Sequence, residues 1–261
     1  MLRAIYAWFE DVGWKIPNPD DAAQILADVA ASGAERALVL VYSHKAGIAR
    51  PLNGWLAGLA RQDTRVIPVG CVHPDDSDLA DIVREALDDH GFLGIKLHCN
   101  VGRFHADDPR FDPLWEALRE RGRLAIVHAG TAPQLDEWVG LKAIARVLVR
   151  FPGLKVQLPH LGMREWETAL DLVERFDVWL DTANVLDSPL VLGDQARPFL
   201  ARLREAALRF PDRILYGSDY PILEPPLGLG IERLRDLKLG DELTDRLLGG
   251  NAADLAAAAV R

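Results

Sequence analysis

The chain has 261 residues, 49% hydrophobic and 26% charged, which suffices for one large core and argues against disorder. Its formal net charge of −9 argues against a nucleic-acid or anionic-membrane surface, because both need clustered positive charge. The two cysteines do not suggest a secreted disulfide scaffold, and no apolar run approaches the roughly 18 residues of a membrane span. The N-terminal residues lack the features of a signal peptide, so we expect a cytoplasmic protein.

Apolar, β-branched runs alternate with amphipathic stretches of helical length along nearly the whole chain. The amphipathic stretches predict helices near 20–32, 46–61, 77–89, 112–121, 140–150, 164–175 and 195–209. The apolar runs predict strands at 36–42, 66–72, 94–97, 124–127, 155–158, 178–180 and 213–216. Residues 2–12 also show helical spacing. Asp20 is the expected cap of the first of these seven helices, and Gly33 and Gly122 are expected helix stops.

This alternation predicts parallel strands joined by right-handed crossovers. A doubly wound open sheet should show a glycine-rich phosphate fingerprint after an early strand, and the sequence has none. We therefore predict an α/β fold, a TIM (β/α)8 barrel in which residues 1–261 form a single domain. Seven βα units are found where a closed barrel has eight, so strand 1 is expected to be missing from this chain. The longer irregular stretches, 99–111 and 183–194, follow strands, where the functional loops of a barrel lie.

Histidines follow five successive predicted strands, at intervals of 29, 25, 30 and 32 residues. They are His44, His73, His98, His128 and His160. Aspartates end the last two strands, at positions 181 and 219. Because the carboxyl ends of barrel strands converge on one face, we expect these side chains to share one site. Imidazole and carboxylate groups bind divalent metals and serve as general acids and bases near neutral pH.

Other polar and aromatic residues allow two interpretations. Lys96 has the same parity as His98 along its strand, so it is expected to point inward, either as a metal-bridging group or as a buried lysine paired with a carboxylate. It is also a candidate for substrate binding. His90 is expected to face solvent, whereas His105 in the loop FHADDP either reaches the site or is solvated. Trp138, in the loop after the fourth predicted strand, is a candidate for substrate contact. The tryptophans within helices, at 115 and 166, are expected to pack in the core.

Together these motifs resemble the amidohydrolase-related metal-dependent hydrolases of the amidohydrolase 2 type. The resemblance covers roughly residues 90–261 and is weaker upstream. The matching segments are GIKLH, DDPRFDPLWEALRERG, VHAG, FPGLKVQLPHLG, VWLDTA, RILYGSDYP and the terminal NAADL.

The resemblance implies a role for each of several residues. His128 corresponds to a metal ligand, and Asp219 to a ligand that also accepts a proton from metal-bound water. His160 corresponds to the residue that polarises the substrate or relays a proton, and His98 to a residue that lines the pocket. The implied cofactor is a divalent metal, zinc first and manganese second, because such an ion lowers the pKa of bound water and polarises a carbonyl.

The sequence departs from the family pattern at one point, because it contains no His-x-His pair, the motif that ends the first strand of the family and supplies two ligands. Counted by family register, the seven predicted strands become numbers two to eight, and residues 2–17 resemble the segment after strand one. Three explanations remain open: a true start upstream of Met1, a degenerate non-catalytic protein, or a gap filled by the 2–12 helix or by a partner chain. With His128 and Asp219 alone, we expect a poorly occupied metal site, to which His160 or Asp181 recruits an ion only loosely.

The leading functional hypothesis is a metal-dependent hydrolase of a small molecule with an amide, ester or lactone bond. The alternative within the enzyme class is a non-oxidative decarboxylase of an aromatic or unsaturated acid. A decarboxylase needs a cation near the substrate carboxylate. Arg103 is either this cation or a solvated loop residue. A third alternative is a non-catalytic barrel. The expected partner is a small-molecule substrate, and a homodimer is expected from the resemblance alone.

Overall fold

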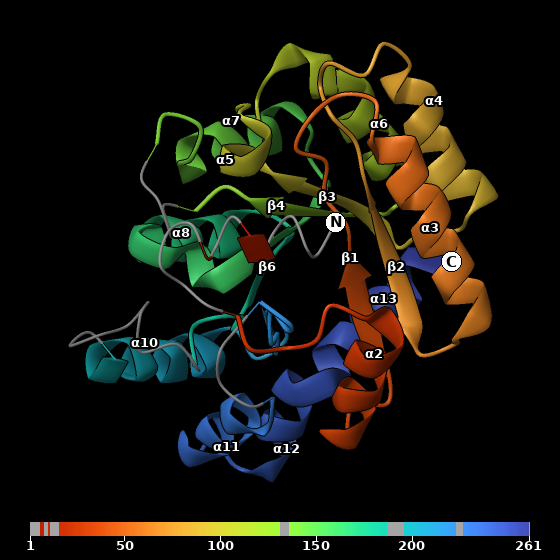
Figure 1. Ribbon diagram of the computed structural model, residues 1–261. Helices are drawn as coiled ribbons and strands as arrows, with labels where there is room; N and C mark the ends of the chain where they lie inside the picture. The colour runs from red at the N-terminus through yellow and green to blue at the C-terminus, as the bar shows by residue number, and fades with distance from the viewer. Residues whose placement is uncertain are drawn as a thin grey trace. The chain divides into compact units, whose positions relative to one another are not determined.

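The computed structural model describes residues 6–7, 10, 16–130, 136–186, 196–222 and 227–260 (Figure 1). These residues group into two compact units. One comprises residues 36–181 and 251–261, and the other comprises residues 1–35 and 182–250. The prediction of a single domain therefore stays a prediction. The predicted helix at 2–12 and most of the loop at 183–194 lie largely outside the described residues.

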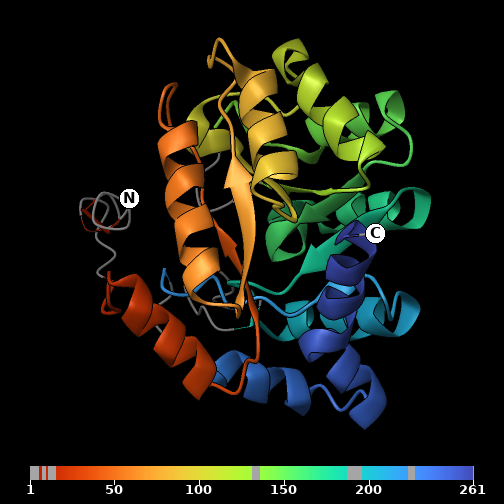
Figure 2. The ribbon, with the colours of Figure 1, turned by 90° about the vertical axis from the view of Figure 1, so that its right-hand side faces the viewer.

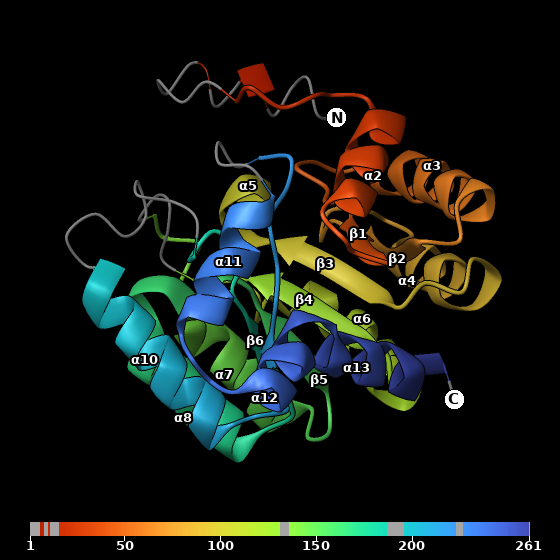
Figure 3. The same ribbon diagram turned by 90° about the horizontal axis from the view of Figure 1, so that it is seen from below.

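The larger unit contains six parallel strands whose order in the sheet is their order in the chain (Figure 3). They are β1 (Ala37–Leu40), β2 (Val66–Cys71), β3 (Gly94–His98), β4 (Leu124–His128), β5 (Lys155–Leu158) and β6 (Val178–Asp181). All six fall where the apolar runs predict strands. Parallel strands in chain order require a crossover between each pair, which confirms the predicted βα alternation.

Helices connect these strands. They are α3 (Ala49–Gln62), α4 (Leu79–Arg84) continued by η1 (Glu85–Asp89), α5 (Cys99–Gly102), η2 (Pro109–Phe111) leading into α6 (Asp112–Glu120), α7 (Leu141–Arg150), and η3 (Pro159–Glu165) leading into α8 (Trp166–Arg175). The larger unit also contains the last helix, α13 (Asn251–Val260), which connects none of these strands. In Figure 2, α3, drawn in orange, runs alongside β2. The predicted loop at 99–111 thus contains two short helical turns, α5 and η2, which the sequence pattern did not indicate.

The core of the larger unit lies between the strands and these helices. Trp115 and Trp166 are 0% and 5% exposed, which confirms their predicted packing role. Helix α6 is followed by Gly122 with φ +61°, a left-handed conformation that favours glycine and ends the helix as predicted.

The smaller unit contains α2 (Ala22–Ala31), α10 (Ala196–Arg209), β7 (Ile214–Leu215), α11 (Gly228–Asp236), α12 (Asp241–Asp245) and η5 (Arg246–Gly250). The cap of α2 is Asp21, whose side chain accepts a 3.0 Å hydrogen bond from the Gln24 amide. The expectation of Asp20 was wrong by one residue. Among the described residues, no helix is both long and apolar enough to cross a membrane.

Candidate active site

Three histidines from successive strand ends lie in contact. His98 and His128 end β3 and β4 and are register partners, and their rings stack with centroids 4.1 Å apart and planes inclined by 12°. His160 follows β5, and its Nε2 lies 3.2 Å from Nδ1 of His128. The rings of these two meet edge to face, with centroids 4.8 Å apart. Parallel pairing of β3, β4 and β5 therefore produces the convergence that the strand-end pattern predicts.

The ring of His160 is held in place through its own backbone. Its φ of +60° is left-handed, and the next three residues also have positive φ, so the chain turns sharply after β5. Asp181, at the end of β6, accepts the His160 amide at 2.9 Å through Oδ1 and the Gln157 side chain at 2.6 Å through Oδ2. Both carboxylate oxygens are thus engaged, so Asp181 orients the 157–160 segment. The expectation that Asp181 recruits an ion loosely stays a prediction.

The contact between His128 Nδ1 and His160 Nε2 is a hydrogen bond, so one of the two nitrogens carries a proton and would bind a metal ion only after losing it. Zinc binds histidine nitrogen at about 2.0–2.1 Å, so two nitrogens on one tetrahedral ion are separated by about 3.3 Å. The observed separation between His128 and His160 is 3.2 Å, and both side chains are 5% exposed. Among the described residues, no group of three or more His, Cys, Asp or Glu side chains is arranged to hold a metal ion. The structure thus offers a pair of donors, and the metal role predicted for His128 stays a prediction.

Lys96 and His98 extend this site along β3. Lys96 is 5% exposed, as the inward interpretation expects. Burial lowers the pKa of His98 well below its ordinary value, and the charges of Lys96 and His160 lower it further, so the ring is neutral. The Asn100 side chain opposes this lowering of the pKa, and among the described residues Nδ1 of His98 has no hydrogen-bond partner.

The other two strand-end histidines lie elsewhere. His44 is exposed. His73 is buried, but its Nε2 is hydrogen-bonded to the Gly102 carbonyl at 3.2 Å, and its role is described below. The structure therefore brings together three of the five histidines. A position after a strand brings a histidine to the correct end of the sheet, but the following turn decides where its ring points.

Several predicted residues lie in the loops after the strands. Arg103 is exposed, has φ +56° and ends α5, and its predicted contact with substrate stays a prediction. His105 is exposed and its ring lies against that of Trp138, with centroids 5.1 Å apart, so the loops after β3 and β4 touch through these two side chains. His90 is exposed, as expected.

Asp219 belongs to the smaller unit, where it follows β7 with a left-handed φ of +54°. The segment around it is tied to that unit at the two residues that follow Asp219. Tyr220 donates a 2.6 Å hydrogen bond from its hydroxyl to Asp28 in α2, and Asn18 donates at 2.9 Å to the Pro221 carbonyl. These bonds fix the backbone around Asp219, whose predicted roles as ligand and proton acceptor stay predictions.

Sequence reasoning missed the hydrogen-bonding turn that follows β2. His73 belongs to the sequence His-Pro-Asp-Asp, in which proline and two aspartates are typical turn residues. That signal was available, but the regular spacing of the five histidines favoured a metal site instead.

The fold and the three contacting histidines, His98, His128 and His160, place the protein among α/β barrel enzymes with polar residues at the carboxyl ends of the strands. The chain belongs to the amidohydrolase family, because the model of the family described as "Amidohydrolase" matches residues 7–255. It is therefore an enzyme of the amidohydrolase type, and the predicted resemblance is confirmed. No curated protein matches the chain.

Solved structures share the fold, which confirms the prediction of a TIM-barrel architecture. An uncharacterized TIM-barrel protein from Bordetella bronchiseptica is 22% identical, with a TM-score of 0.74 and coverage of 92% of this chain and 84% of that one. A 5-carboxyvanillate decarboxylase from Novosphingobium aromaticivorans, complexed with manganese and 4-hydroxy-3-methoxy-5-nitrobenzoic acid, is 16% identical, with a TM-score of 0.69 and coverage of 90% and 79%. A probable 2-pyrone-4,6-dicarboxylic acid hydrolase from Acinetobacter baumannii, with citric acid bound, is 13% identical, with a TM-score of 0.67 and coverage of 93% and 93%.

Proposed function

We propose that this enzyme is a metal-dependent hydrolase that cleaves an amide, ester or lactone bond of a small molecule. The observation that carries the proposal is the pair of imidazole nitrogens, His128 Nδ1 and His160 Nε2, 3.2 Å apart at the carboxyl ends of neighbouring strands. In this proposal His128 binds one divalent ion, zinc or manganese, and the contact keeps His160 directly beside that ligand. A bound divalent ion lowers the pKa of water toward neutrality and polarises a carbonyl group.

The residues of the chain divide the remaining work. His128 contributes one nitrogen to the ion, and His160, whose backbone is held by Asp181, stands beside it to relay a proton or polarise the substrate. The sequence resemblance assigns Asp219 as a further ligand and as the proton acceptor. The neutral His98 stacks on His128 and supports the orientation of that ring.

Decarboxylation of a carboxylic acid is the second candidate, and the buried position of Lys96 favours it. This side chain shares one face of β3 with His98, because residues two apart on a strand point the same way. A buried cation attracts a carboxylate more strongly than an exposed one, because solvent screens it less. The decarboxylase and the hydrolase described above both act on carboxylic acids according to their names.

The test begins with the purified protein, supplied with zinc or manganese and offered a panel of lactones, esters, amides and aromatic acids. Hydrolysis of an ester or lactone consumes water and releases a proton, which a pH-stat records, and hydrolysis of an amide consumes water and releases an amine, which an amine assay detects. Decarboxylation releases carbon dioxide, which a coupled assay detects. We expect His128→Ala to remove metal-dependent turnover, and Asp219→Asn to reduce it by about 100-fold or more. His90→Ala is the matched control, because that histidine is exposed. Turnover that survives in His128→Ala, or that needs no metal, would overturn the proposal.

A further inference from the structure

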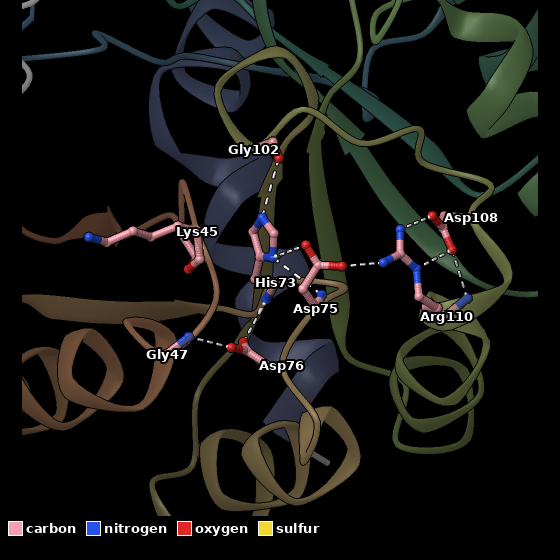
Figure 4. A network of polar contacts seen from close by, with 9 residues as sticks. Lys45, Gly47, His73, Asp75, Asp76, Gly102, Asp108 and Arg110 are labelled. Carbon is pink, nitrogen blue, oxygen red and sulfur yellow. Dashed lines mark hydrogen bonds and ion pairs between the residues drawn. The ribbon is translucent and has the colours of Figure 1, made fainter.

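The segment after β2 forms a tight turn whose side chains reach into two other loops (Figure 4). The Asp76 amide donates a 3.0 Å hydrogen bond to the His73 carbonyl and closes the turn at residues 73–76. Both side chains are buried, at 8% and 5% exposed. A buried polar turn is stable only if its donors and acceptors are paired, so the partners of this turn show what it holds.

The imidazole of His73 holds the loop after β3. Its Nδ1 accepts the Asp75 amide at 3.2 Å, so this nitrogen carries no proton and the ring donates from Nε2. The acceptor is the Gly102 carbonyl at 3.2 Å. Phe104 packs edge to face on the same imidazole, with ring centroids 5.7 Å apart. A Cβ atom at position 102 would lie 2.1 Å from the Phe104 ring, so glycine allows the ring to close against the loop.

The same turn holds the far end of that loop. The Asp75 carboxylate forms an ion pair with Arg110, whose guanidinium also binds the Asp108 carboxylate at 3.0 Å through Nε. The loop is therefore attached at residue 102 and again at residues 108–110. These ion pairs are exposed and contribute little stability by themselves. The buried His73 contact is consequently the principal attachment.

A third loop joins through Asp76. Its Oδ1 accepts the Gly47 amide at 2.7 Å and its Oδ2 accepts the His73 amide at 2.9 Å. One turn thus connects the loops that follow β1, β2 and β3, and dashed lines in Figure 4 mark these attachments.

We propose that His73 is a positioning residue for the reaction: its buried ring fixes the 99–111 loop, which begins beside His98 and carries Arg103. The loop starts directly after the histidine that stacks on His128, so its position determines how the far side of the substrate meets the site. Loss of the His73 contact is expected to affect substrate binding more than the chemical step. This inference rests on the proposed function for its kinetic consequence, and on contacts alone for its structural one.

A matched pair of substitutions separates the two ring nitrogens. In His73→Gln the amide nitrogen takes the place of Nε2 and retains a donor for the Gly102 carbonyl. In His73→Asn the shorter side chain keeps an acceptor for the Asp75 amide but cannot reach the carbonyl. Both variants are examined as the full-length protein for amide hydrogen exchange of residues 99–111, and for KM and kcat on any substrate found above. His90→Asn and His90→Gln are the matched controls at an exposed position.

We expect exchange in residues 99–111 to be about fivefold faster in His73→Asn and close to wild type in His73→Gln, as the loss of one net hydrogen bond implies. We also expect KM to rise about three- to tenfold in His73→Asn, with kcat within about twofold, and to recover in His73→Gln. Unchanged exchange and KM in His73→Asn would overturn the inference, as would equal effects of the two variants. Hydrogen exchange needs no substrate, so it tests the attachment of the loop even if the proposed hydrolase activity is not found.

Discussion

Removing the carboxylate of Asp76 is expected to lower the free energy of unfolding of the larger unit by an amount that follows from its two hydrogen bonds. It accepts two backbone amides, from Gly47 at 2.7 Å and from His73 at 2.9 Å, and the side chain is 8% exposed. Asp76→Ala removes both acceptors and leaves two amides without their carboxylate partner. The His73 amide is buried, and a buried donor without a partner costs about 1–3 kcal/mol, whereas the amide of the exposed Gly47 is hydrated instead; the free energy of unfolding is therefore expected to fall by about 1–3 kcal/mol.

The measurement is urea unfolding followed by circular dichroism, with Asp76→Asn as the intermediate variant. The asparagine keeps one acceptor oxygen but turns an amide nitrogen toward one of the two backbone donors, so it is expected to lose nearly as much stability as alanine. Asp81→Ala, at an exposed position on α4, is the control and is expected to change stability by less than about 0.5 kcal/mol. A loss below about 1 kcal/mol in Asp76→Ala would refute this reasoning about the turn.

Three further predictions concern other parts of the larger unit. Gly94→Ala is expected to destabilise the protein by more than about 3 kcal/mol in the same unfolding assay, because the new Cβ would lie 1.8 Å from a carbonyl oxygen of β4; a soluble, equally stable variant would contradict the strand register. Hydrogen bonds from Arg65 lower the pKa of Asp63 to about 2, so this contact stabilises the fold above about pH 3.9, and the stabilisation is lost as the pH falls through about 2. Arg65→Gln should raise the pKa of Asp63, as NMR titration of the carboxyl group will measure. Burial raises the pKa of the Cys71 thiol, and that of Cys99 to about 12, so a thiol reagent at pH 8 should label neither in the native protein and both in urea.

The strands and helices of the larger unit were predictable because each has one dominant local signal. Strands such as β4 read as uninterrupted apolar runs, since a parallel strand is buried on both faces. Helix α7 is amphipathic, with its apolar residues buried along one side. The short turns α5 and η2 were not predictable, because four and three residues are too few to show a helical period.

The candidate site was predictable only in part, for a physical reason. Topology fixes where a strand ends, so His98 and His128 meet as register partners wherever β3 and β4 pair. The direction of a side chain after the strand depends on the backbone of the next turn, which sequence spacing does not encode. A left-handed backbone brings the ring of His160 into contact with His128. The turn after β2 instead buries the ring of His73 against the loop after β3.

The metal content of the purified protein is the measurement that bears most directly on the proposed site. Catalytic zinc sites normally have three protein ligands, and the sequence lacks the His-x-His pair that supplies two of them in the family. The resemblance assigns only His128 and Asp219 as ligands, so the bound ion is expected to exchange readily. After dialysis against metal-free buffer we expect less than about 0.2 metal ions per chain by mass spectrometry, and activity that rises with added zinc or manganese in the micromolar range. Near-stoichiometric zinc or manganese after such dialysis would contradict this expectation, because it would require further ligands that the protein supplies from elsewhere.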